Sequence, residues 1–167
     1  MNSVDPEQAT RAALRRLGVA YEWLDCDPAF ADTAAFCERY GYPPDHAGNT
    51  IIVVAKKEPR QYAACVVTGI TRLDVNRAVR GLLGAPKVSF ASAEEMAQLT
   101  GMEVGGVTIF ALPADIPIYV DERIMALDYV ILGSGARNGK VKVSPAVLAR
   151  LPRVQIIRDL ARPRAEA

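Results

Sequence analysis

Residues 50–68 read TIIVVAKKEPRQYAACVVT, two apolar runs separated by a charged segment that contains a proline. The runs, Thr50–Ala55 and Tyr62–Thr68, are short and rich in valine and isoleucine. Runs of this kind, bounded by polar or turn-forming residues, are typical of β-strands. The stretch therefore predicts two strands and a fold built around a sheet.

Outward from this stretch, seven more runs predict strands and five segments carry helix start and stop signals. The other predicted strands are Tyr21–Asp25, Lys87–Phe90, Val107–Leu112, Ile118–Asp121, Tyr129–Leu132, Lys140–Val143 and Val154–Ile157. The predicted helices are 6–17, a short one between Asp32 and Gly41, 74–83, one from Ser92 to Gly101, and one from Ser144 to Leu151. Because helices and strands do not strictly alternate, we expect an α+β fold with a mixed, curved, barrel-like sheet flanked by about five helices.

The chain has 167 residues, of which 50% are hydrophobic, and this size predicts a single domain over 1–167. We expect its core over about 6–160 and a frayed tail over 162–167. No window approaches the 18 apolar residues of a membrane span, and the acidic start lacks the features of a secretory signal. A cytoplasmic protein with no membrane partner is the expectation.

Positive charge is concentrated at the C-terminal end of the chain. The net charge is only +1, but residues 137–167 carry eight basic and two acidic side chains, and fifteen of the twenty basic residues are arginine. The planar guanidinium suits contacts to phosphate, which would fit a nucleic-acid-facing surface. Charge alone favours a solvated terminal segment, and the nucleic-acid-facing surface stays open as an alternative.

The cysteines and the single histidine exclude several kinds of site. Cys26, Cys37 and Cys65 are spaced by 11 and 28 residues, which matches neither a zinc-binding pattern nor a redox Cys-x-x-Cys pair. Each is expected to be a small buried thiol. His46 lies in a loop-like segment and is expected to be solvated, so the sequence predicts no metal site and no nucleophile–histidine triad.

A glycine-rich segment near the C-terminus superficially resembles a nucleotide loop. Residues 133–139 read GSGARNG, but the third glycine comes one residue late and a strand follows instead of a helix. These differences exclude a dinucleotide-binding motif. Three glycines in seven residues make either a plain strand connection or a loop whose N–H groups a ligand can approach.

Two further segments are candidates for ligand contact. Gly105 and Gly106 come immediately before an apolar run, where a glycine pair indicates either a bulge or a place where a ligand touches the backbone. Asn49 and Thr50 enter the first of the two strands quoted above. From these residues alone, a structural role and a contact with a ligand both stay open.

Taken in order, these motifs resemble the YbaK-like editing domains associated with prolyl-tRNA synthetase. The similarity runs from about Ala9 to Asp159. It is carried by Thr50–Ala55, Ala63–Thr68 with Gly69, Leu73-Asp74, Ala91-Ser92-Ala93-Glu94-Glu95, Thr100-Gly101, Gly105-Gly106-Val107, Asp121-Glu122 and the late glycine-rich loop.

The resemblance implies a trans-editing deacylase that hydrolyses the ester of a mischarged aminoacyl-tRNA, such as Ala-tRNA(Pro) or Cys-tRNA(Pro). It implies no metal or organic cofactor. The implied partner is the tRNA 3′ end, with an aminoacyl-tRNA synthetase as a further candidate and no DNA. In this family a ribose hydroxyl, a bound water or the amino acid's own thiol is thought to attack, while backbone groups hold the carbonyl.

The resemblance also implies a set of site residues. The catalytic candidates are Asn49, Gly105 and Gly106, and the substrate-binding candidates are Thr50, Thr108, Asp121, Ser134 and Gly135. Gly105 and Gly106 would bind the scissile carbonyl, and Asp121 or Ser134 would touch the amino group or a water. We expect the pocket to lie between Asn49-Thr50, the Gly105-Gly106 turn and the Ser134-Gly135 loop.

The chain departs from the family pattern at Asn49 and again at Thr108-Ile109-Phe110-Ala111, where the family usually has a proline and a glycine. Many members have a lysine where this chain has Asn49, and an amide brings no charge to a phosphate contact. Lys56 and Lys57 are roughly 23 Å further along an extended strand, too far to replace it. This departure keeps an alternative function open, namely a non-catalytic module of the same fold that binds tRNA, a synthetase or a small ligand.

Overall fold

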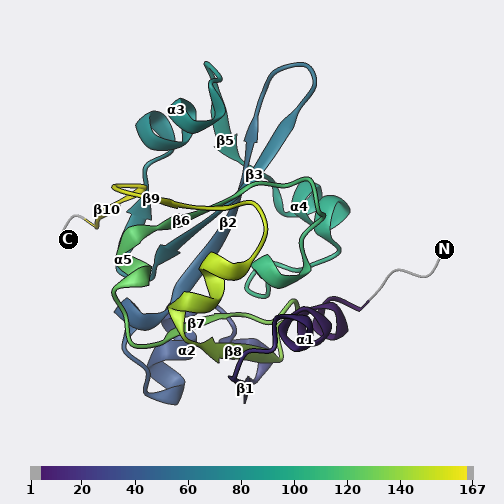
Figure 1. The fold of residues 1–167 in the computed structure, drawn as a ribbon, viewed down its shortest axis with the longest axis vertical. Helices are drawn as coiled ribbons and strands as arrows, with labels where there is room; N and C mark the ends of the chain where they lie inside the picture. The colour runs from purple at the N-terminus through teal and green to yellow at the C-terminus, as the bar shows by residue number, and fades with distance from the viewer. Residues whose placement is uncertain (1–4, 165–167) are drawn as a thin grey trace.

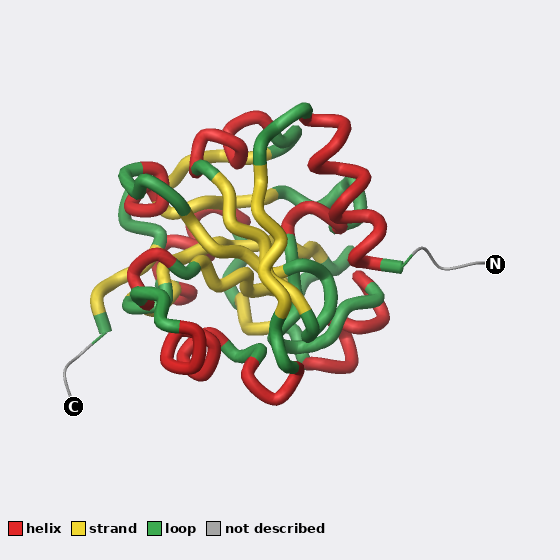
Figure 2. Tube along the Cα trace, turned by 90° about the horizontal axis from the view of Figure 1, so that it is seen from below, coloured by secondary structure: helices red, strands yellow, loops and turns green. Residues whose placement is uncertain are grey.

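The computed structural model describes residues 5–164, which form an α+β fold with strands gathered in the middle (Figures 1 and 2). The α-helices are α1 (Pro6–Leu17), α2 (Thr33–Tyr40), α3 (Arg80–Leu83), α4 (Ala93–Thr100) and α5 (Glu122–Met125). The strands are β1 (Tyr21–Asp25), β2 (Gly48–Ala55), β3 (Gln61–Thr68), β4 (Thr71–Leu73), β5 (Val88–Phe90), β6 (Ile118–Asp121), β7 (Val130–Gly133), β8 (Gly139–Val143), β9 (Val154–Ile157) and β10 (Ala161–Pro163). The predicted fold class is confirmed.

The central sheet has five strands in the order β5-β2-β3-β6-β9. The two strands of the quoted stretch, β2 and β3, form its antiparallel centre, with Thr50 opposite Val66. β6 pairs in parallel with both β3 and β9, so the sheet is mixed. Since β5 and β9 are free edges, the sheet is open and the expected barrel-like closure is not seen.

Both faces of the central sheet are buried. Along β3, Ala64 and Val66 face one hydrophobic cluster, while Ala63, Cys65 and Val67 face another. This arrangement explains why β2 and β3 read as continuous apolar runs and not as an alternating pattern. All three cysteines are buried free thiols, as expected.

The caps that the sequence predicted for α1 and α4 are present in the structure. The Asp5 carboxylate accepts a hydrogen bond from the Glu7 N–H at the start of α1, and Gly18 ends that helix in the left-handed conformation. Ser92 caps α4 by accepting from the Glu95 N–H at 3.0 Å. No helix between residues 5 and 164 combines the length and the apolar character needed to cross a membrane.

One local prediction is wrong, and two predicted helices are present but are not regular α-helices throughout. The run Val107–Leu112 is not a strand but holds a single 3₁₀ turn, Ile109–Ala111, because the Thr108 hydroxyl accepts from the Phe110 N–H and the apolar side chains pack beside α1. The segment Ser144–Leu151 is likewise a 3₁₀ helix, Pro145–Arg150. The helix expected at 74–83 opens with a π-helical turn, Val75–Val79, before α3.

The C-terminal segment is also more ordered than we expected. Arg162 and Pro163, placed in a frayed tail by the sequence, belong to β10, which pairs with β4. The guanidinium of Arg162 is 2.9 Å from a carboxylate oxygen of Asp74. Residues 165–167 of the expected tail lie outside the described residues.

Candidate functional site

A cavity of about 380 Å³ lies where β2 runs past the end of β5. β5 covers β2 only from Val53 to Ala55, so the first half of β2 has no neighbour on that side. Several segments that are distant in sequence close the space around this open edge. They are the start of α2 (Asp32, Thr33), β2 (48–51), the start of α4 (Ala91, Ala93, Met96), the loop residues Val104, Gly105 and Val107, and Gly133 and Lys140.

The backbone of Thr50 faces this open edge. The Ala91 N–H donates to the Ile52 carbonyl at 2.9 Å, so Ile52 points toward β5. Because alternate residues of an antiparallel strand direct both backbone groups to the same side, the N–H and C=O of Thr50 point the same way, beyond the reach of β5. Its hydroxyl oxygen is buried and has no hydrogen-bond partner among the described residues. The backbone N–H and C=O of Thr50 thus face the open edge at the cavity wall, whereas its hydroxyl oxygen is enclosed.

Asn49 lines the same wall and is linked to α2. The Thr33 hydroxyl donates to its side-chain oxygen, and the two N–H groups of the amide have no acceptor among residues 5–164. The start of α2 lines the cavity as well, and the Asp32 carboxylate does not cap the helix because it pairs with Arg137 at 3.1 Å.

The loop around Gly105 forms another wall and is held in place by two cationic side chains. Arg137 donates to the Val104 carbonyl at 2.7 Å, and Lys140 donates to the Gly105 carbonyl at 2.9 Å. Gly105 has φ +87°, a conformation that favours glycine. Its own N–H finds no acceptor within residues 5–164, and Gly105 is one of the residues that line the cavity.

The two glycine-rich segments pack directly against each other. The Gly135 N–H donates to the Gly106 carbonyl at 2.7 Å, and the Gly106 N–H donates to Glu103 at 2.9 Å. A Cβ on Gly106 would lie 2.6 Å from the backbone of Ala136, so a side chain cannot be accommodated there. Gly106 and Gly135 therefore hold the loops together, whereas Gly105 faces the cavity.

The other candidate residues lie away from the cavity lining. Ser134 is buried, and its hydroxyl donates to the Ala136 carbonyl at 3.1 Å. Thr108 is buried and caps the 3₁₀ turn described above. Of the eight residues implied by the family, the structure brings Asn49, Thr50 and Gly105 together at the cavity. The remaining five support the surrounding loops or lie elsewhere.

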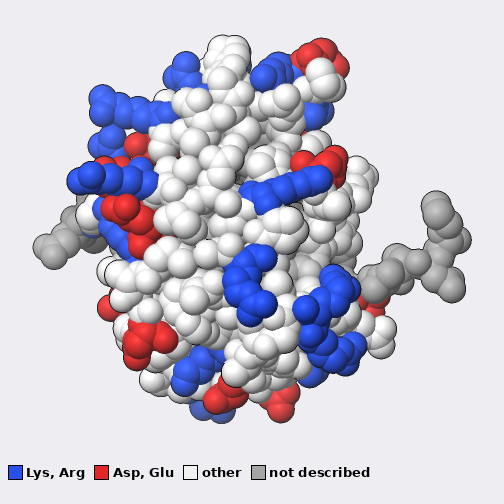
Figure 3. Space-filling model, viewed as in Figure 1, with Lys and Arg blue, Asp and Glu red and all other residues white. Residues whose placement is uncertain are grey.

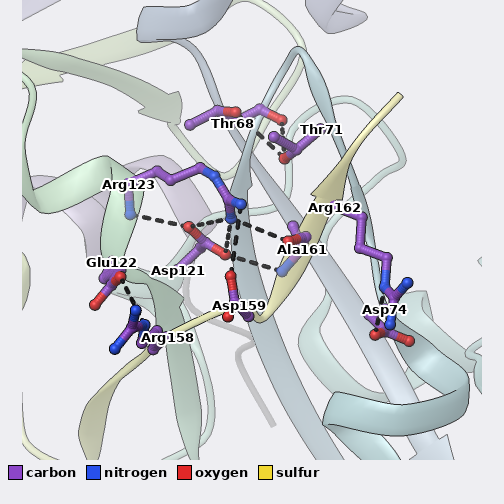
Figure 4. A network of polar contacts seen from close by, with 10 residues as sticks. All are labelled: Thr68, Thr71, Asp74, Asp121, Glu122, Arg123, Arg158, Asp159, Ala161 and Arg162. Carbon is purple, nitrogen blue, oxygen red and sulfur yellow. Dashed lines mark hydrogen bonds and ion pairs between the residues drawn. The ribbon is translucent and has the colours of Figure 1, made fainter. Parts of the chain in front are cut away.

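Asp121 is the candidate furthest from its expected role. It is completely buried and caps α5, accepting from the Arg123 N–H at 2.9 Å and from the Ala161 N–H at 2.9 Å. The Arg123 guanidinium lies 3.1 Å from the same carboxylate (Figure 4). Both oxygens are thus occupied by the fold, and this placement does not agree with a contact to a substrate amino group.

His46 is also more constrained than expected. Its two ring nitrogens lie 2.8 Å from Asp45 and 2.9 Å from Asp128, instead of facing solvent freely. The hydrogen bond with Asp45, followed by that with Asp128, raises the pKa of the imidazole. His46 does not line the cavity.

Lys140 is the cavity residue that sequence reasoning missed. It lies on β8, where the alternation Lys-Val-Lys-Val predicts lysines on a solvent face. Instead its side chain is only 7% exposed, and burial lowers the pKa of its ammonium. No local pattern marks it, since its burial follows from the distant segments that surround β8.

Comparison with known proteins identifies a family and shared folds. A model of the aminoacyl-tRNA editing domain matches residues 27–151. The uncharacterized protein YwhH of Bacillus subtilis (strain 168) is 30% identical over 92 residues, which cover 55% of this chain and 57% of that protein. The chain thus spans little more than half the length of that relative.

Solved structures share the whole fold. The crystal structure of hypothetical protein APE2540 superposes with a TM-score of 0.82 at 27% identity, covering 92% of this chain and 99% of that one. A protein proposed to be a trans-editing enzyme for prolyl-tRNA synthetase has a TM-score of 0.80 at 20% identity, covering 96% and 99%. Since the domain match extends over most of the sequence, the chain belongs to the aminoacyl-tRNA editing domain family of YbaK type.

Proposed function

We propose that this protein is a trans-acting deacylase that hydrolyses the ester bond of a mischarged aminoacyl-tRNA, with Ala-tRNA(Pro) and Cys-tRNA(Pro) as the first candidates. The observation that carries the proposal is the unused N–H of Gly105 at the wall of a cavity, in a chain of the editing-domain family. A backbone donor in this position suits a carbonyl oxygen that becomes negatively charged during ester hydrolysis.

In this proposal the ester carbonyl lies against Gly105. A water attacks the carbonyl carbon and gives up a proton, the carbonyl oxygen becomes an oxyanion held by the Gly105 N–H, and the tRNA oxygen takes up that proton as its bond to the carbonyl carbon breaks. A good donor of this kind contributes roughly 3 kcal/mol to the stability of the transition state. After hydrolysis, the products are the free amino acid and a tRNA with its terminal hydroxyl restored.

The open edge of β2 would hold the rest of the terminal residue. The backbone of Thr50 and the free amide of Asn49 can hydrogen-bond to the aminoacyl group or the ribose. Gly106, Ser134 and Gly135 would act indirectly, by keeping the Gly105 loop in place. We assign Thr108 and Asp121 to the support of the fold.

A basic surface on α1 supports an RNA substrate. Figure 3 shows Lys and Arg side chains gathered over α1, which contributes Arg11, Arg15 and Arg16. Arginine at a surface suits the phosphate backbone of tRNA. The same proposal places the protein in the cytoplasm, where it would act with or without a synthetase.

The direct test incubates the pure protein with tRNAs charged with the wrong amino acid, Ala-tRNA(Pro) and Cys-tRNA(Pro) first, alongside correctly charged Pro-tRNA(Pro). We expect ester loss well above the buffer rate for at least one mischarged tRNA. Loss no faster than in buffer for every member of the panel would reject the proposal. Salt-sensitive tRNA binding without turnover would instead support the non-catalytic binding module, which the uncharged Asn49 favours.

A further inference from the structure

The cavity contains one buried cation whose hydrogen-bonding capacity is largely unused. An ammonium group has three donors, and the Lys140 Nζ uses one of them on the Gly105 carbonyl at 2.9 Å. Within residues 5–164 it makes no other hydrogen bond and no ion pair. Since Lys140 lines the cavity, its remaining donors are available to a ligand there.

The surroundings of Lys140 supply no unpaired counter-charge. Asp32 is the nearby carboxylate, but it already pairs with Arg137 at 3.1 Å, and Arg137 is itself a cation. Burial raises the pKa of the two neighbouring thiols, Cys26 and Cys37, so both are neutral near pH 7. A buried charge without a partner is costly, and folds keep such groups chiefly where a ligand completes them.

A purely structural role explains the position less well. Holding the Gly105 carbonyl needs one neutral donor, which an amide or a hydroxyl would provide without the cost of burying a charge. The ammonium also lies 5.8 Å from the ring of Phe36, too far for that contact to compensate strongly. The positive charge of Lys140 is not needed to hold the Gly105 carbonyl, and it therefore points to an anionic ligand.

We infer that Lys140 supplies the positive charge of the site and binds an anionic oxygen of the substrate beside Gly105. This inference rests on the proposed function, because the substrate is taken to be an aminoacyl ester of tRNA. Lys140 thereby provides a cation in a cavity where Asn49 brings none. Two oxygens of that substrate share the required chemistry, namely the oxyanion that forms at the ester carbonyl and the phosphate of the terminal nucleotide.

The test compares Lys140→Met with Lys142→Met. Lys142 lies two residues further along β8 and contacts the ring of Tyr129 at 4.5 Å, outside the cavity lining, so it is a matched control. On mischarged tRNA we expect kcat/KM to fall at least 100-fold for Lys140→Met and less than threefold for Lys142→Met. Lys140→Arg, which keeps the charge, should recover part of the loss. Lys140→Met activity within threefold of the wild type would overturn the inference.

Binding of three stable compounds tests the same inference without turnover. The neutral compound is 3′-alanylamino-3′-deoxyadenosine, the second is the same molecule with a 5′-phosphate, and the third is the adenosine ester of 1-aminoethylphosphonate, an anionic mimic of the tetrahedral intermediate. We expect Lys140→Met to weaken binding of an anionic compound at least tenfold and to leave the neutral one within threefold. Loss confined to the phosphonate assigns Lys140 to the oxyanion, and loss confined to the 5′-phosphate assigns it to the phosphate.

The outcomes separate this inference from the proposed function. Equal losses on all three compounds, or none, would show a structural role for Lys140 and overturn the inference even in an active deacylase. Lys140-dependent binding of an anionic compound, with no hydrolysis of any mischarged tRNA, would reject the deacylase and keep the anion site. If Lys140→Met does not fold, NMR of the wild-type Lys140 side chain decides: the inference requires a resonance shift with an anionic compound that the neutral one does not produce.

Discussion

Asp121 and Lys140 are both buried charges, but the fold treats them differently. Asp121 is fully enclosed and accepts hydrogen bonds from two backbone N–H groups and from Arg123, so it ties β6, α5 and β10 together (Figure 4). Lys140 is 7% exposed and has a single carbonyl as partner. A buried charge with complete partners stabilises the fold, whereas an incompletely partnered one at a cavity is available for binding.

The largest effect is expected from breaking the complete network. Asp121→Ala leaves two backbone donors and a guanidinium without their acceptor, and should lower the free energy of unfolding by about 3–5 kcal/mol. Urea denaturation measures this loss. Asp159→Asn is the control, because Asp159 is 76% exposed and lies 3.7 Å from Arg123, so its loss should change stability little. Similar effects of the two substitutions would show that the buried Asp121 network stabilises the fold no more than the exposed Asp159–Arg123 pair does.

The next largest effect concerns the packing that supports the cavity. Gly106→Ala places a methyl group 2.6 Å from the Ala136 backbone and should destabilise the protein by about 1–3 kcal/mol, and it should also reduce deacylation. Gly81→Ala is the matched control, since a Cβ there meets nothing within 4 Å and should stabilise α3 by about 0.5–1 kcal/mol. Thermal unfolding of both variants checks the sign of each change. A stable, active Gly106→Ala protein would show that the two glycine segments need not touch.

A smaller effect on stability is expected at Lys140, in the opposite direction. Removing an incompletely partnered cation should leave the free energy of unfolding of Lys140→Met within about 1 kcal/mol of the wild type, or above it, near pH 7. The pKa of Lys140 is lowered in the folded state, so the unfolded chain binds more protons and the wild type gains stability as pH rises through that pKa.

Urea denaturation of the wild type and Lys140→Met at pH 7 and pH 10 therefore checks whether the charge of Lys140 lowers the stability of the fold. Any advantage of Lys140→Met over the wild type should shrink at the higher pH. If Lys140→Met instead destabilises the protein as much as Asp121→Ala does, Lys140 belongs to the supporting structure and the comparison between the two charges fails.

The smallest effect should come from His46, a charge that has two partners but lies near the surface. Hydrogen bonds with Asp45 and Asp128 raise its folded pKa. The resulting stabilisation is present below the unfolded pKa, about 6.5, and is lost as pH rises through the folded value. The difference in Tm between wild type and His46→Gln should thus be largest near pH 5 and absent by pH 9. An unchanged difference across this range would show that protonation of His46 does not contribute.

Much of the fold could be predicted because its signals are local. The strands Tyr21–Asp25, Ile118–Asp121 and Val154–Ile157 have the predicted bounds, and α1 begins and ends at its predicted caps. β4 and β10 were missed because short strands owe their pairing to each other and not to a pattern in either segment. The run Val107–Leu112 was misread because an apolar stretch of six residues fits a buried turn as well as a strand.

The site was predicted less completely, and for a physical reason. The family resemblance pointed to Asn49, Thr50 and Gly105, which do meet at the cavity. It also pointed to Asp121, whose carboxylate is taken up by backbone groups that are distant in sequence. Lys140 could not be recognised at all, because a lysine in an alternating strand carries no sign of the segments that will cover it.

The open half of β2 has a further consequence for the protein in a crowded solution. An unpaired strand edge is a template on which another polypeptide can add a strand, and proteins usually blunt such edges with charges, prolines or bulges. Here the start of α4 and the Val104–Val107 loop stand over the edge. Because these segments occupy the space beside the edge, we expect the same cover that shapes the pocket to hinder the addition of a strand from another molecule.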